Sequence, residues 1–131
     1  MSRISLSLLL LAAMASPAWA QGRPDAPVPA PLPPPATRFT STVTASIAGR
    51  TQRLDIILQT FLIGNLTSVE LPHTGDLIVH VRAGDLAAVV DGQRGKHTPD
   101  ESFVVLAGAR VMIETDRDSA VVQVVEVSPS R

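Results

Sequence analysis

From residue 38 onward, short runs rich in Val, Ile and Thr alternate with turn-forming residues, and this rhythm constrains the fold more than any other feature. Gly, Pro, Asn and Asp interrupt the runs about every eight to twelve residues, a spacing typical of a β-sandwich or barrel. No segment shows a sustained helical period with caps. The sequence therefore predicts an all-β domain, with strands at 39–47, 52–60, 66–71, 77–82, 86–91, 102–106, 110–115 and 119–127.

One apolar run, 54–63 (LDIILQTFLI), also resembles a short buried helix. Its density of Ile, Leu and Phe favours a buried strand or a strand pair. Two tight turns are also expected further along the chain, at Asp91-Gly92 and at Ala83-Gly84-Asp85, where glycine supplies the positive φ.

Residues 1–20 have the features of a secretory signal peptide. Arg3 gives the positive start, residues 4–15 form an apolar run too short to span a bilayer, and Ala18 and Ala20 are the small residues of a cleavage site. We expect cleavage after Ala20 and a periplasmic or secreted product. The sequence contains no cysteine, so neither a lipoprotein anchor nor a disulfide is expected, and no membrane anchor is predicted.

Residues 21–37 contain seven prolines in seventeen positions. Proline lacks a backbone donor, so this stretch is expected to form neither a ladder nor a helix and to sample extended polyproline II. It is interpreted as a stiff linker, and 38–128 as the folded domain.

Charge and aromatic content argue against two ligand classes. After removal of residues 1–20 the chain carries 10 Lys and Arg against 12 Asp and Glu, both signs scattered along its length. Nucleic-acid binding needs a concentrated basic patch, and a polybasic membrane clamp needs the same. Outside the signal the aromatic residues are three phenylalanines, Phe39, Phe61 and Phe103, too few for base stacking as well as a core.

The spacing of residues 64–115 resembles that of the cupin family. Gly64, Glu70, Pro72, Leu77 and Gly84 follow the intervals of the family's first motif. The positions of the second motif are taken by Asp100, Leu106-Ala107-Gly108, Val111 and Thr115. Three glycines, Gly64, Gly84 and Gly108, keep the motif identity, and each is expected at a sharp turn with unusual φ and ψ.

This resemblance implies a single cupin-like β-barrel or jelly roll of two antiparallel sheets. Cupin enzymes typically hold a transition metal through three histidines and one glutamate, and those positions are Glu70, Pro72, Leu77 and Val111 here. Proline, leucine and valine offer no donor atom, so the resemblance implies neither a metal nor another cofactor.

Two residues remain candidates for acid–base chemistry. Glu70 is expected at the barrel mouth, where apolar surroundings would raise its pKa, and His73 could turn inward to pair with it. The alternative is a solvated or arginine-paired carboxylate beside an exposed histidine. His80 is expected to face solvent, because Leu77, Val79 and Val81 alternate with it, and His97 is placed in a loop.

The former metal pocket is predicted to be apolar. Its lining residues would be Glu70, Pro72, Leu77, Val79, Val111 and Ile113. Either neighbouring side chains fill it as a plain core, which we favour, or a dry cavity remains that suits a small apolar ligand.

The sequence thus leads to an exported, metal-free cupin-like binding or interaction module. Two alternatives stay open, a metal-independent enzyme that uses Glu70 with His73 and a structural envelope component. A homodimer is expected, because about eight strands leave sheet edges that need covering, and residues 39–47 are a candidate for that pairing. A small ligand or a protein is the other expected partner.

Overall fold

The computed structural model describes residues 26–130, and within that range the regular structure consists of strands. The expected signal peptide, residues 1–20, lies outside the described residues. The strands are β1 (Val28–Pro29), β2 (Thr37–Ile47), β3 (Arg50–Ile63), β4 (Thr67–Glu70), β5 (Asp76–Ala83), β6 (Leu86–Val90), β7 (Gln93–His97), β8 (Ser102–Val105), β9 (Val111–Thr115) and β10 (Ala120–Pro129). The prediction of an all-β domain is confirmed, and 54–63 belongs to a strand rather than a helix.

Two five-stranded sheets make up the domain. Sheet A has the order β1-β4-β9-β6-β7, and sheet B has the order β2-β3-β10-β5-β8. From β3 to β10 the eight strands are shared four and four between the sheets, with most chain neighbours in opposite sheets, which is a jelly-roll arrangement. No ladder joins the two sheets among the described strands, so the expected closed barrel is wrong and the fold is an open sandwich.

The core lies between the two sheets. Leu77, Val79 and Val81 of β5 are buried, as their alternation predicts, while Ile78 and Arg82 face outward. The buried side chains of sheet A meet them, with Val111 and Ile113 both fully buried. At the β7–β8 edges the ring of His97 stacks on Phe103 with centroids 4.3 Å apart, so side chains rather than hydrogen bonds close this side.

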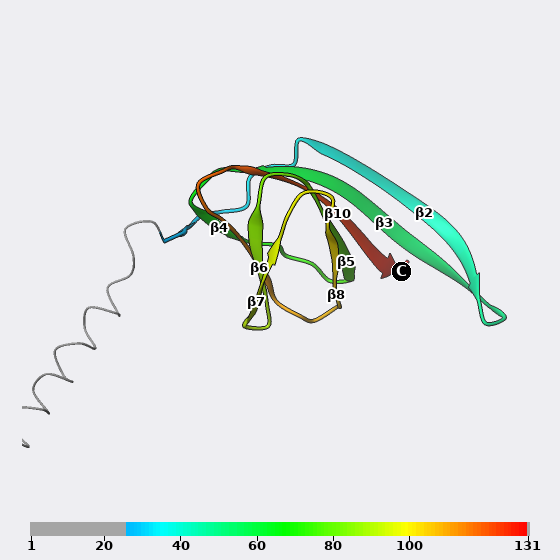
Figure 1. Ribbon diagram of the computed structural model, residues 1–131. Helices are drawn as coiled ribbons and strands as arrows, with labels where there is room; N and C mark the ends of the chain where they lie inside the picture. The colour runs from blue at the N-terminus through cyan, green and yellow to red at the C-terminus, as the bar shows by residue number, and fades with distance from the viewer. Residues whose placement is uncertain (1–25, 131) are drawn as a thin grey trace, which may run out of the picture.

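A long hairpin extends from the sandwich. β2 and β3 pair over eleven consecutive residues without a register shift, and Figure 1 shows them running side by side well past the other strands. Ala48 and Gly49 connect them, with φ of 52° and 76°, and two positive φ values define a type I′ turn. The right-handed twist of such a turn matches that of the strands it joins.

Two segments form strands that the sequence did not predict. In the proline-rich stretch, Val28–Pro29 pairs in parallel with Thr67–Ser68, so the expectation that no ladder forms there is wrong at β1. Proline is tolerated because β1 is an edge strand, and the N–H groups of Val28 and Ala30 make the bonds to sheet A. β7 was read as a loop because its sequence, QRGKH, contains no apolar run.

The expected turns form where glycine is needed. Asp91-Gly92 has φ of 48° and 84°, and Gly84 has φ of 75° with Ser119 so close that no side chain would fit. Gly108 also has positive φ, at 87°. Gly64 is not among the positive-φ residues, so the expectation of unusual backbone geometry is wrong there.

Candidate functional site

The six residues of the expected pocket separate into two groups. Leu77, Val79, Val111 and Ile113 are at most 2% exposed and belong to one core cluster between the sheets. Pro72 is exposed on the β4–β5 connection, and the Glu70 side chain is 47% exposed. The sandwich therefore gathers the four aliphatic residues and leaves the proline and the carboxylate outside them.

Strand alternation explains why Glu70 points outward. Val69 pairs with Ile113 in the ladder, and both side chains are buried in the core. The next residue, Glu70, pairs with Met112 and must project from the opposite face. The carboxylate consequently lies on the outer surface of sheet A rather than at an interior mouth.

On that surface Glu70 forms a two-point contact with Arg110. Its Oε1 accepts a hydrogen bond from Arg110 Nε at 2.7 Å, and Oε2 accepts one from Nη2 at 3.3 Å. The hydrogen bond from Arg110 lowers the pKa of Glu70, and the charge of the guanidinium acts in the same direction, against a smaller opposing effect of burial. The raised pKa of the acid–base hypothesis is not found, and the contact agrees with the alternative expectation, an arginine-paired carboxylate.

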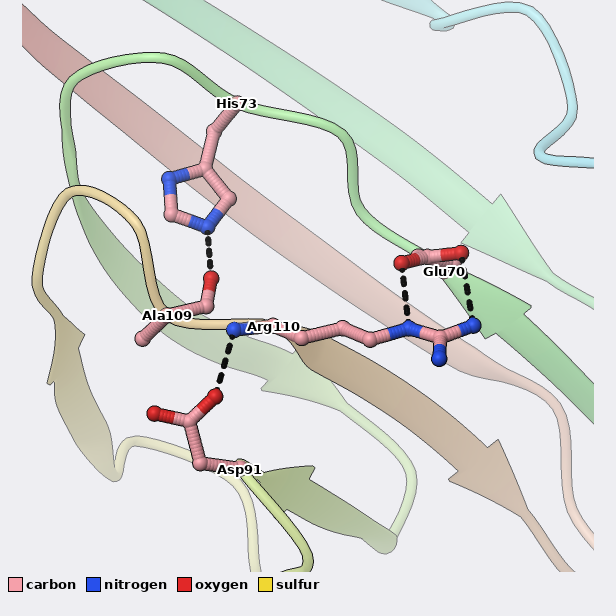
Figure 2. A network of polar contacts seen from close by, with 5 residues as sticks. All are labelled: Glu70, His73, Asp91, Ala109 and Arg110. Atoms are coloured by element: carbon pink, nitrogen blue, oxygen red, sulfur yellow. Dashed lines mark hydrogen bonds and ion pairs between the residues drawn. The ribbon is translucent and has the colours of Figure 1, made fainter.

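His73 fastens two loops together instead of pairing with Glu70. Its Nδ1 lies 2.7 Å from the Gly75 carbonyl and its Nε2 lies 2.6 Å from the Ala109 carbonyl. Figure 2 shows the imidazole pointing at Ala109, while the neighbouring Arg110 side chain runs away from it toward Glu70. A neutral imidazole has one N–H to donate, and only the imidazolium can donate to both carbonyls.

The same region is held by a carboxylate from β10. Glu126 Oε2 accepts hydrogen bonds from the N–H groups of Thr74 and Gly75, at 2.8 and 2.9 Å. Burial acts to raise the pKa of Glu126, but the hydrogen bonds from Gly75 and Thr74, aided by the charge of His73, outweigh it and the net shift is downward. Both groups hold the β4–β5 connection in place.

The other two histidines are also occupied. His80 faces outward, as predicted, and its Nδ1 lies 2.7 Å from Ser102 Oγ. His97 lies in β7, not in a loop, and its Nδ1 is 3.2 Å from Glu101 Oε2. Across residues 26–130, no three His, Asp or Glu side chains come together as a metal site would require.

A different feature stands out on the outer face of sheet B. One row of directly paired residues crosses all five strands, and every member is apolar. The row consists of Phe39 (β2), Leu58 (β3), Val125 (β10), Ile78 (β5) and Val104 (β8). Phe39 is 65% exposed, Val104 62% and Ile78 43%, while Leu58 and Val125 are half-buried, so the row is most exposed at its two ends.

Further apolar residues widen this row into a patch, which we call the sheet B face. Ile56 and Val127 are neighbours in the adjacent row. Six of the eight exposed large hydrophobic residues in the described chain project from this face, namely Phe39, Val43, Ile47, Leu62, Ile78 and Val104. A polar row, Thr37, Thr60, Gln123, His80 and Ser102, crosses the face beside the apolar one.

The sheet B face was not predicted from the sequence, although the composition of two strands indicated it. An antiparallel strand with one solvated face should alternate apolar and polar residues, whereas seven of the ten residues in 54–63 and six of the eight in 120–127 are apolar. The first run was assigned to a buried strand or strand pair and the second to a strand, and neither was given an apolar outer face. Continuous apolarity in antiparallel strands therefore indicated two apolar faces.

Comparison with known proteins does not place this chain in a family. No family model matches the sequence, and no curated protein matches it. The described part of the chain holds no helix long and apolar enough to cross a bilayer.

Several solved structures resemble the fold. A cupin-2 domain protein from Shewanella frigidimarina is 15% identical, with a TM-score of 0.47, covering 69% of this chain and 80% of that one. A cupin 2 conserved barrel domain protein from Leptotrichia buccalis is 20% identical, with a TM-score of 0.47 and coverage of 71% and 42%. A protein from Neisseria meningitidis is 14% identical, with a TM-score of 0.48 and coverage of 67% and 84%.

Two of these neighbours are named as cupins. Because the identities are at most 20% and the TM-scores at most 0.48, neither a family nor an activity is transferred to this chain. The jelly-roll description rests on the strand order of this chain. The function of this chain is therefore inferred from its own residues, above all from those on the two outer faces of the sandwich.

Proposed function

We propose that this chain is an exported, non-catalytic interaction module that binds a folded protein through the sheet B face. The observation that carries the proposal is the unbroken apolar row from Phe39 to Val104 across all five strands. Soluble domains rarely leave contiguous apolar surface of this extent open, and where they do it usually marks a binding site.

The size of the face fits a protein partner better than a small ligand. Five strands about 4.8 Å apart, and about 3.4 Å per residue along the ten β3–β10 pairs, give a footprint of up to roughly 800 Å². A standard protein–protein interface buries about 800 Å² on each side, whereas a small ligand needs an enclosed cleft.

The composition of the face also fits a protein interface. Its centre carries no charged residue, the polar row lies beside it, and the ionic residues Asp76 and Arg82 are placed toward the two ends of β5. Depletion of charge at the centre with polar residues at the margin is the common pattern of protein interfaces. Export is supported by the features of residues 1–20. From Val28 onward the proline-rich stretch is part of the module, because β1 pairs with β4 and Ala30 and Leu32 pack against the core.

Site-specific photo-crosslinking in the producing cell tests this function. A photoreactive phenylalanine analogue at Val104 is expected to yield a discrete adduct with one protein. The same analogue at Lys96, on the outer face of sheet A, is the matched control and is expected to yield none. An absence of adducts from both Val104 and Ile78 would contradict the proposal, and an adduct at twice the chain mass would identify the partner as a second copy.

Export has its own measurement. N-terminal sequencing of the protein recovered from the periplasmic or extracellular fraction is expected to begin at Gln21. A cytoplasmic product that begins at Met1 would contradict this part of the proposal.

A further inference from the structure

The outer edges of the two sheets differ in how they are protected. β1 consists of two residues and ends in Pro29, β8 has four residues, and β7 carries Arg94 and Lys96. Short length, proline and basic side chains are the features that prevent edge-to-edge pairing. Three of the four edges are therefore protected.

The fourth edge, β2, has only one of these features, a basic side chain at Arg38 near its start. It is eleven residues long, and from Phe39 to Ile47 it contains no charge and no proline. Its pairing with β3 has no bulge that would bend it away. Among residues 26–130 nothing pairs with its outer side. A long, uncharged, regular edge is a template for another strand.

The turn geometry shows which backbone groups of β2 face outward. In the Ala48-Gly49 turn the Ile47 carbonyl accepts from the Arg50 N–H, so Ile47 and Arg50 form a hydrogen-bonded pair. Hydrogen-bonded and non-hydrogen-bonded pairs alternate along an antiparallel ladder. The odd-numbered residues of β2 therefore bond to β3, and the N–H and C=O groups of the even-numbered residues, such as Thr42 and Thr44, point to the free side.

The sequence of β2 is close to a palindrome about Val43. Read outward from Val43, FTSTVTASI places Thr42 opposite Thr44, Ser41 opposite Ala45, Thr40 opposite Ser46 and Phe39 opposite Ile47. Two copies of this strand, aligned antiparallel at Val43, would thus match like with like. Thr–Thr, Thr–Ser and aromatic–β-branched pairs are among the cross-strand pairs that stabilise sheets, and no charges would oppose one another.

We propose that two copies of this chain pair along β2, antiparallel, with a twofold axis at Val43. The even-numbered residues supply the hydrogen bonds, and sheet B becomes one continuous ten-stranded sheet. Phe39 and Ile47 project from the sheet B face, so the pairing joins the apolar faces of both copies into a single surface. The proposal goes beyond the binding function above and does not depend on it.

Disulfide trapping tests the register directly, because the natural chain has no cysteine. In the proposed ladder the two Val43 Cα atoms form a non-hydrogen-bonded pair about 4.5 Å apart, within disulfide range. Val43→Cys is therefore expected to give mostly covalent dimer under mild oxidation. Phe39→Cys and Ile47→Cys are the matched controls. In each single variant the cysteine lies about 27 Å from the same cysteine of the other copy, so no disulfide-linked dimer should form. Combined in one chain, they should give dimer.

A proline substitution tests the hydrogen bonds. Thr44→Pro removes an N–H that faces the free side, so the β2–β3 ladder keeps its bonds while pairing between copies loses two symmetry-related ones. Sedimentation equilibrium is expected to show a dimer for the wild type and at least a tenfold higher dissociation constant for Thr44→Pro. A thermal melt checks that the variant is folded, and Thr44→Lys, which places a charge on the edge, provides a second disruption.

Two results would overturn the proposal. One is a wild-type chain that remains monomeric at about 100 µM with no Val43→Cys dimer. The other is a dimer that Thr44→Pro leaves unchanged and that Ile78→Lys abolishes, since such a dimer would form through the sheet B face. The cross-linking test at Val104 is read independently, because Val104 lies in β8, at the opposite edge of sheet B from β2.

Discussion

The two outer faces of the sandwich meet the same solvent but have opposite chemistry. On sheet A, Glu70 pairs with Arg110 and Arg94 with Glu114, and Lys96, opposite Ala87, adds a further charge. On sheet B, one apolar side chain follows another from Phe39 to Val104. The first face has the composition that keeps a sheet monomeric, whereas the second is apolar without being buried. This difference is the reason why contact with another protein is proposed for sheet B and not for sheet A.

The largest expected effect separates the inward and outward residues of one strand. Leu77→Ala should reduce the free energy of unfolding by about 2–5 kcal/mol, because it opens a cavity in the core. Ile78→Ala, on the sheet B face, should cost about 1 kcal/mol or less. Urea denaturation of both variants measures this. An equally large loss for Ile78→Ala would mean that the outer face is packed like a core, and the contrast between the two faces would fail.

The next effect concerns the apolarity of the faces. Replacing Ile78 and Val104 with lysine should lower the fluorescence of a hydrophobic dye bound to the protein several-fold, since both side chains are exposed in the apolar row. A matched pair of lysines at Glu70 and Met112, ladder partners on the outer face of sheet A, should leave dye binding unchanged. Equal losses from the two pairs would show that the sheet B face is not distinct.

A smaller effect is the pH dependence of the stability that Glu126 contributes. The folded-state pKa of Glu126 is below its usual value, so its contribution to stability is present above about pH 4.5 and is lost as the pH falls through the lowered pKa. Glu126→Gln should cost about 1 kcal/mol at pH 7, because the loop N–H groups lose a charged acceptor. Denaturation from pH 7 to pH 3 should show the gap between wild type and variant closing, and a gap that widens would contradict this sign.

The smallest effect is expected for the ion pair on sheet A. Glu70→Gln should leave the urea midpoint unchanged within error, because both partners are exposed and screened by solvent. The matched variant Arg110→Gln should behave in the same way. A clear loss for either would show that the sheet A face depends on its ion pairs for stability.

Part of the site was predictable and part was not. The inward positions of Leu77, Val79 and Val81 and the outward position of His80 followed from alternation within one strand. Glu70 was placed wrongly because a motif spacing says nothing about the face from which a residue projects, and its neighbours Val69, in β4, and Leu71, just after it, are the buried residues. For His73 the sequence left open a pair with Glu70 or an exposed ring, whereas the ring lies between carbonyls of two loops that are far apart in sequence.

Local sequence patterns were enough to predict eight of the ten strands in residues 26–130, the tight turns at Asp91-Gly92 and Gly84, and the aliphatic core residues of β5 and β9, because these depend on local backbone preferences and on period-two alternation. The tertiary structure alone decided which strands lie side by side, and so which apolar residues align into one row. That alignment joins β2, β3, β10, β5 and β8 from distant parts of the chain. Strand pairing is a non-local choice, and no local pattern specifies a partner in advance.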